Sequence, residues 1–252
     1  MIEFQNVYKF YGTTPAVNGI SLKVKPGEIF GFLGPNGAGK TTSIRMATGI
    51  FPPTDGTILI DGVDIQKDPG LCKAKIGYVP DRPYVYEKLT GWEFIEFIMD
   101  LYECSSEHSR DLAHHYLKMF QIDHAVDRLV EDYSHGMKQK LVILTSLLHE
   151  PALIVIDEPM VGLDPRGARS LKDLFKKLSS EGTSIFLSTH TMSVAEEMCD
   201  RISIINQGKI LATGTMAELR ARGHNDDDLE ALFLRITEEE IQEAEKSDST
   251  EN

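Results

Sequence analysis

A glycine-rich segment near the N-terminus is the clearest candidate for chemistry in this chain. It reads Gly-Pro-Asn-Gly-Ala-Gly-Lys-Thr-Thr and fits the phosphate-binding pattern Gly-x-x-x-x-Gly-Lys-Ser/Thr, here called the P-loop. Glycines let backbone N–H groups turn inward around a phosphate, and a following helix directs the positive end of its dipole there. The pattern predicts nucleotide binding by Gly34, Pro35, Asn36, Gly37, Ala38, Gly39, Lys40, Thr41 and Thr42.

Two adjacent carboxylates could complete such a site. Asp157 ends an apolar run, and Glu158 follows it directly. We expect Asp157 and Thr41 to ligate Mg²⁺, while Lys40 reaches the terminal phosphates. Adjacent residues at a strand end point to different sides, so Glu158 is placed to polarise an attacking water as a general base. A small-molecule kinase would need no such water, so the carboxylate pair favours hydrolysis.

Continuous apolar runs must position these groups. Residues 28–33, 152–157, 183–188 and 201–206 are such runs, separated by helix-like segments, and they predict buried parallel strands. The first run leads directly into the P-loop, and a helix is expected over 41–48. The first 30 residues and residues 56–62 instead alternate between apolar and polar, which predicts short antiparallel strands. The expected fold class is α/β, a P-loop NTPase (RecA-like) core with an N-terminal antiparallel β layer.

A helical insertion interrupts this alternation of strands and helices. Between about Thr90 and Glu150 the pattern is helical throughout, with Phe94, Phe97, Ile98 and Leu101 on one helix face. We expect one ATPase domain over 1–222, with a helical subdomain at about 88–150. Residues 223–252 are expected to form a docked helix followed by an acidic tail.

Composition and charge narrow the classes of function. The chain has 252 residues, of which 41 % are hydrophobic and 26 % charged, which is typical of a globular protein. Its net charge is −13, with eleven acidic residues between Asp226 and Asn252. A solvated acidic tail and the lack of a basic stripe argue against a nucleic-acid partner. No apolar run approaches the about 18 residues that span a bilayer, and no secretion signal begins the chain, so a cytoplasmic location is expected.

Further motifs in a characteristic order make the chain resemble the nucleotide-binding subunit of an ATP-binding-cassette (ABC) transporter, over about residues 2–214. Tyr11 matches the aromatic residue of the A-loop. Residues 134–139, Ser-His-Gly-Met-Lys-Gln, occupy the place of the signature motif, at the start of a helix expected over 138–149. Residues 162–164 match the D-loop, and His190 matches the switch histidine.

The resemblance implies a dimer in which two copies, or this chain and a related ATPase subunit, sandwich two ATP molecules. Each ATP would be bound by the P-loop of one subunit and by Ser134 and Gly136 of the other. Tyr11 would stack on adenine, and His190 would contact the γ-phosphate within its own subunit. Asp164 would help to link the two sites across the interface.

Two departures from the family pattern concern the metal and the signature motif. Asp81 stands where the family usually has a glutamine near Mg²⁺, and its carboxylate can still serve as an oxygen ligand and take part in catalysis. An acidic residue here resembles the drug-export-like branch with separate permeases. Its charge should weaken nucleotide binding when Mg²⁺ is absent. His135 and Met137 replace the usual glycine and glutamine, whereas Ser134 and Gly136 retain the family pattern.

The expected function is therefore that of an ATP-binding and ATP-hydrolysing subunit, which drives export through separate transmembrane permease subunits from the inner face of the membrane. Residues 82–89 are rich in aromatic residues for a loop, and the resemblance implies that they help to receive the permease. The alternative is an ABC-type ATPase with cytosolic partners, resembling iron–sulfur assembly factors.

Overall fold

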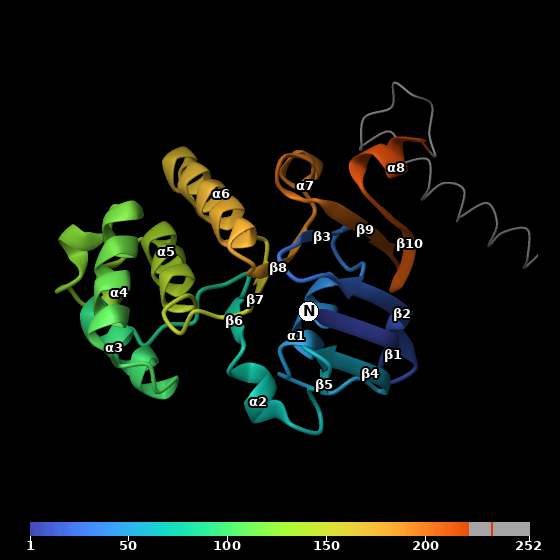
Figure 1. Cartoon of the computed structure of the whole chain (residues 1–252), viewed down its shortest axis with the longest axis horizontal. Coiled ribbons are helices and arrows are strands. Elements are labelled where there is room, and N and C mark those ends of the chain that lie inside the picture. Colours follow the sequence, from blue (N-terminus) through green and yellow to red (C-terminus); the bar gives the residue numbers. More distant parts are fainter. Residues whose placement is uncertain (222–232, 234–252) are drawn as a thin grey trace, which may run out of the picture.

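The computed structural model describes residues 1–221 and Phe233 (Figure 1). The helix and acidic tail predicted over 223–252 thus lie almost entirely outside the described residues. Within the described part of the chain, no helix combines the length and apolar character needed to cross a membrane.

A six-stranded sheet forms the centre of the molecule, with strand order β10-β9-β3-β8-β7-β6. Five of its strands run parallel, and only β10 pairs antiparallel, with β9. Every residue of β3, β7 and β8 is buried, which explains their continuous apolar sequences because layers cover both faces. The bounds are β3 Ile29–Leu33, β6 Ile76–Val79, β7 Leu153–Asp157, β8 Ser184–Thr189, β9 Arg201–Asn206 and β10 Lys209–Gly214.

The predicted antiparallel layer is a second sheet, with strand order β2-β1-β4-β5. Its inner face packs on the central sheet through a cluster of aromatic rings. The ring of Phe186 on β8 lies 5.9 Å from that of Phe4 on β1, and 6.1 and 5.6 Å from those of Phe30 and Phe32 on β3. The bounds are β1 Ile2–Tyr11, β2 Thr14–Val24, β4 Asp55–Ile60 and β5 Val63–Asp64.

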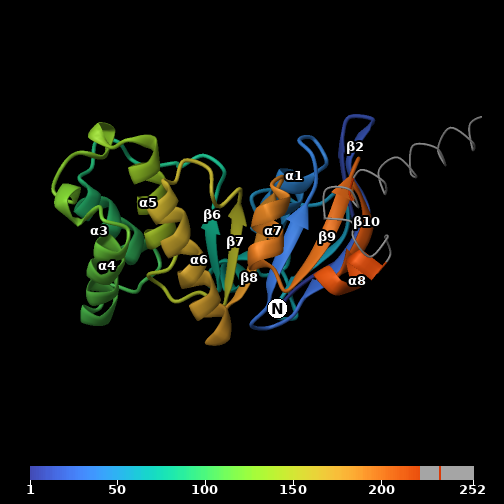
Figure 2. The ribbon, with the colours of Figure 1, turned by 90° about the horizontal axis from the view of Figure 1, so that it is seen from above.

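The predicted helical insertion forms a separate group beyond the β6 edge of the central sheet (Figures 1 and 2). It contains α3 Gly91–Leu101, α4 Glu107–Met119 and α5 His135–Thr145, with 3-10 turns at Asp123–Ala125 and Val130–Asp132. A capping box between Thr90 and Glu93 begins α3. The other helices are α1 Lys40–Ala47, α2 Pro69–Lys73, α6 Pro165–Ser180, α7 Met192–Met198 and α8 Met216–Ala221.

The start of α5 differs from the sequence prediction. A helix was expected over 138–149, but α5 begins at His135 because the Ser134 side chain caps it by accepting a hydrogen bond from the Met137 N–H. The signature motif is therefore the first turn of the helix and not a loop that precedes it.

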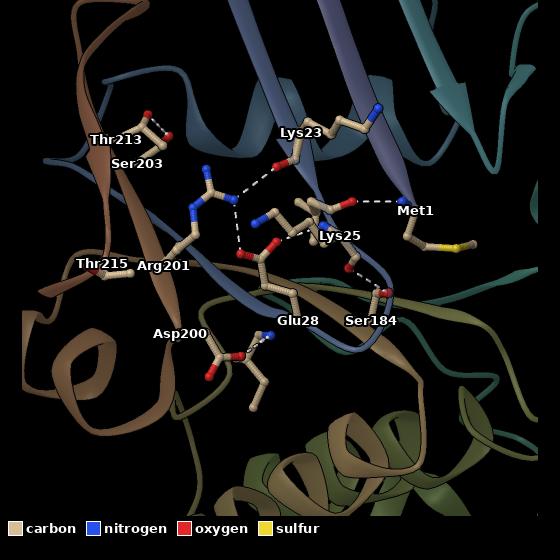
Figure 3. Close-up of polar contacts among 12 residues, drawn as sticks. Met1, Lys23, Lys25, Glu28, Ser184, Asp200, Arg201, Ser203, Thr213 and Thr215 are labelled. Carbon is tan, nitrogen blue, oxygen red and sulfur yellow. Dashed lines mark hydrogen bonds and ion pairs between the residues drawn. The ribbon is translucent and has the colours of Figure 1, made fainter. Parts of the chain in front are cut away.

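A network of polar contacts fixes the start of β3, the strand that leads to the P-loop (Figure 3). Arg201 at the start of β9 donates to the Glu28 carboxylate at 3.0 Å, and its guanidinium lies 5.3 Å from the centre of the Phe30 ring. Glu28 also accepts a hydrogen bond from the Lys25 N–H at 2.7 Å, and Asp200 accepts one from the Ile29 N–H at 2.8 Å. These contacts hold β3 against β9 at the edge opposite the P-loop.

We predict that Arg201→Ala lowers the free energy of unfolding by about 2–3 kcal/mol, because it leaves the buried Glu28 carboxylate without its cation. Urea denaturation measures the change. Lys177→Ala, which removes an exposed ion pair with Glu181, is the control and should cost much less. Equal losses for the two variants would contradict the role given to Arg201.

Candidate nucleotide-binding site

The P-loop passes so close to neighbouring backbone that only glycine fits at two positions. A Cβ atom on Gly34 would lie 2.3 Å from the carbonyl oxygen of Ile205 on β9. A Cβ on Gly39 would lie 2.5 Å from the carbonyl oxygen of Ala16, and Gly39 has a φ of +106°, which side chains disfavour. The loop is thus clamped between β9 and β2 with its backbone free to approach a ligand.

A cavity of about 240 Å³ opens at this loop, where the parallel strands end. It brings together most of the predicted P-loop residues with Asp81, Asp157 and Glu158, which come from three separate parts of the sequence. Ala16, which no sequence motif indicated, also lines the cavity. The lining residues are Ala16, Asn36, Gly37, Gly39, Lys40, Thr41, Thr42, Asp81, Asp157 and Glu158.

Lys40 begins α1, and the P-loop itself binds its ammonium group. The Nζ atom donates to the carbonyl oxygens of Gly34 at 2.8 Å and Pro35 at 3.0 Å. Burial lowers the pKa of Lys40, and the charges of Glu158 and Asp157 partly oppose this. A cation held by neutral carbonyls in a partly dry site is suited to receive a phosphate.

Asp157 ends β7 almost fully buried and accepts hydrogen bonds from two hydroxyl groups. Thr41 Oγ1 donates to Asp157 Oδ2 at 2.7 Å, and Ser188 Oγ donates to Asp157 Oδ1. Hydroxyl and carboxylate oxygens are the donors that Mg²⁺ prefers. No role was predicted for Ser188 from the sequence. Ser188 lies opposite Asp157 in the register of β7 and β8. Its polar side chain near the end of an apolar run was the signal that could have identified it.

Glu158 follows β7 and has hydrogen-bond partners different from those of Asp157. Its backbone has a φ of +54°, and its Oε1 accepts a hydrogen bond from His190 Nδ1 at 2.7 Å. Thr189 Oγ1 donates to Oε2 at 3.3 Å. The predicted base and the predicted switch histidine are thus direct partners in one chain, while Thr189 was missed by the sequence analysis.

The signature motif packs on the D-loop of the same chain. A Cβ on Gly136 would lie 2.5 Å from the carbonyl oxygen of Gly162, and a Cβ on Gly162 would lie 2.6 Å from the His135 ring. Asp164 caps α6 by accepting from the Gly167 N–H at 2.6 Å, and Lys140 Nζ lies 3.0 Å from its other oxygen. Both contacts lower the pKa of Asp164.

Eight predicted residues do not line the cavity of the single chain. Gly34, Pro35 and Ala38 belong to the P-loop that borders it, and His190 is hydrogen-bonded to Glu158. The other four come from other parts of the chain. Ser134, Gly136 and Asp164 lie at the junction of the signature motif and the D-loop, and Ser134 and Asp164 are exposed. Tyr11 at the end of β1 has 54 % of its surface exposed and packs edge-on against Phe51, with ring centres 6.4 Å apart. These surfaces are open to a further molecule.

Comparison with known proteins agrees with this geometry. The sequence profile of the family described as ABC transporter matches residues 17–161. The linearmycin resistance ATP-binding protein LnrL of Bacillus subtilis is 36 % identical over 94 % of this chain and 76 % of its own length. The bacitracin transport ATP-binding protein BcrA of Enterococcus faecalis is 37 % identical over 88 % of this chain and 71 % of its own length.

Solved structures show the same fold. The ATP-binding subunit of an ABC transporter superposes with a TM-score of 0.90 at 30 % identity, covering 94 % of this chain and 99 % of the other. The cassette MJ0796, solved as a dimer in a post-hydrolysis state with ADP and Pi, superposes with a TM-score of 0.78 at 26 % identity, covering 86 % of this chain and 99 % of the other. The predicted fold class is confirmed, and the chain belongs to the ABC transporter family as an ATP-binding subunit, an ATPase that works in transport.

Proposed function

We propose that two ATPase subunits, two copies of this chain or this chain and a relative, close around two Mg²⁺-ATP molecules and drive export through a separate permease. The observation that carries this proposal is the separation of the two predicted halves of the site. The P-loop, Asp157 and Glu158 line one cavity, whereas Ser134 and Gly136 lie on the exposed first turn of α5, outside it. A second subunit would supply that turn to the nucleotide, and the dimeric cassette MJ0796 supports this arrangement.

Within one subunit, the side chains have distinct roles in this proposal. Lys40 exchanges the carbonyl oxygens of its own loop for the β- and γ-phosphates. Thr41, Asp157 and Asp81 would hold Mg²⁺, which neutralises phosphate charge. Glu158 orients and polarises the attacking water, and its hydrogen bond to His190 fixes the imidazole near the γ-phosphate. Tyr11 would stack on adenine, and Asp164 would link the two sites through the D-loop.

The permease is proposed to dock where the helical subdomain meets the core. A cavity of about 270 Å³ lies there, lined in part by Tyr78, Pro80, Tyr84 and Phe94. Tyr84 has 73 % of its surface exposed, which is unusual for an aromatic residue and favours an interface. Such docking places the chain on the cytoplasmic face of the membrane. The export direction rests on relatives such as LnrL, whose name describes resistance.

The proposed domain organisation follows from the same division of roles. Residues 1–222 form the ATPase domain, and residues 88–150 within it form the helical subdomain that carries the signature motif. Residues 223–252 are proposed to be a docked helix followed by an acidic tail.

Glu158→Gln should reduce ATP hydrolysis at least about 100-fold and make the chain accumulate as an ATP-bound dimer, because the amide cannot accept the proton of the water. Phosphate release and sedimentation measure the two effects. Glu181→Gln, an exposed change beyond α6, is the control that should behave as the wild type. Normal turnover in Glu158→Gln would remove Glu158 as the base.

Asp81→Asn should tighten ATP binding about fivefold when EDTA removes Mg²⁺, because one negative charge near the phosphates is lost. Fluorescence titration with and without EDTA measures the change. Asp173→Asn on the exposed face of α6 removes the same charge elsewhere and should leave the affinity unchanged. Equal affinity of the wild type with and without Mg²⁺ would contradict the role of Asp81.

Affinity purification of Glu158→Gln from detergent-solubilised cells with ATP should recover a polytopic membrane protein, identified by mass spectrometry. Adding Tyr84→Ala should reduce that recovery about fivefold, because an exposed aromatic anchor is lost. Adding Leu71→Ala, which removes another exposed apolar side chain, is the control. Recovery of cytosolic proteins alone would favour an ABC-type ATPase without a permease.

A further inference from the structure

The segment between β6 and α3 carries exposed aromatic residues and is anchored on the helical subdomain. The Tyr86 ring lies edge-on to Phe97, with ring centres 5.1 Å apart, and 6.4 Å from that of Phe94. Both phenylalanines belong to α3. Glu87 follows Tyr86 directly in the sequence. The packing of Tyr86 on α3 therefore restrains the backbone that carries the Glu87 side chain.

Backbone hydrogen bonds hold this segment beside the residues that lead into the signature motif. Glu131 N–H donates to the carbonyl oxygen of Glu87 at 3.0 Å, and Val130 N–H donates to that of Leu89 at 2.9 Å. The chain then continues for two residues before Ser134. Segments about 45 residues apart in the sequence thus lie side by side, with Glu87 at the end nearest the signature motif.

An ion pair continues this contact onto the first turn of α5. Lys138 Nζ lies 2.6 Å from Glu87 Oε1, and only 17 % of the Lys138 side chain is exposed. The hydrogen bond and charge of Lys138 lower the pKa of Glu87. Lys138 N–H also donates to the carbonyl oxygen of Ser134 at 3.0 Å, so its backbone belongs to the turn that presents Ser134 and Gly136.

We propose that Glu87 is a positioning residue for the signature turn, residues 134–138, and acts through Lys138. The inference rests on the proposed function, because the turn must be ordered to bind the nucleotide of a second subunit. The first turn of a helix frays easily, and a charged contact from a packed segment restricts it before the dimer closes.

The chain contains a matched control for this ion pair. Lys88 Nζ lies 2.6 Å from Glu131 Oε2, the same distance as between Lys138 Nζ and Glu87 Oε1. The Lys88–Glu131 pair joins the two segments that the backbone hydrogen bonds already hold together. It does not reach α5, because Glu131 precedes the signature turn. Removing it should weaken the segment contact without releasing the turn.

The experiment compares Glu87→Ala, Lys88→Ala and the charge swap Glu87→Lys/Lys138→Glu, each in the Glu158→Gln background. Sedimentation measures ATP-driven dimerisation, and titration of the dilute monomer measures ATP affinity. We expect Glu87→Ala to weaken dimerisation about fivefold, counting two copies of a partly exposed ion pair, with unchanged ATP affinity of the monomer. The charge swap should restore most of the loss, and Lys88→Ala should have no effect.

Hydrogen exchange of residues 135–141 in the nucleotide-free chain gives a second readout. Glu87→Ala should speed exchange there, the charge swap should reverse this, and Lys88→Ala should not reproduce it. Equal behaviour of Glu87→Ala and Lys88→Ala, or failure of the swap to restore, would overturn the inference. If the Glu158→Gln parent stays monomeric with ATP, the proposed dimer fails, and hydrogen exchange alone then decides the role of Glu87.

Discussion

The register of three parallel strands is the constraint on which the site depends. In the central sheet Leu33 lies opposite Thr189, and Asp157 lies opposite Ser188, so β3, β7 and β8 end at one edge. The P-loop, both carboxylates and His190 follow directly from these ends. Because side chains alternate along a strand, a slip of one residue in β7 would turn Asp157 to the opposite face of the sheet, away from the hydroxyl groups of Thr41 and Ser188. The metal-binding role proposed for Asp157 thus depends on main-chain pairing in the core, and the role proposed for Glu158 depends on its place directly after that strand.

This register is fixed from both faces of the central sheet and from both ends of β3. The aromatic cluster around Phe186 joins the central sheet to the antiparallel layer, and the helices cover its other face. At the start of β3, Glu28 and Arg201 tie the strand to β9, while Gly34 and Gly39 press the far end against Ile205 and Ala16. Packing supplies most of the stability, and the polar contacts select one alignment of the strands.

Local sequence predicted the parts of the site that lie on consecutive residues. The P-loop and the pair Asp157–Glu158 have spacings that carry their own physical reason, and the apolar runs predicted the strands within one residue. Ser188 and Thr189 were missed because their hydrogen bonds to Asp157 and Glu158 arise only when β8 lies beside β7 in the folded sheet. The start of α5 was placed three residues too late, since capping by Ser134 extends the helix. The contact between Glu87 and Lys138 could not be predicted from the sequence, because it forms only when the helical insertion brings α5 beside the segment that precedes α3.

The packing of His135 on Gly162 links two positions that are 27 residues apart. A residue with a side chain at position 162 would meet the imidazole at 2.6 Å and would also be strained by a φ of +79°. The imidazole of His135 therefore fits against the D-loop because Gly162 has no side chain. During evolution, a larger residue could be accepted at position 162 only after position 135 had become smaller, so the order of such changes is constrained.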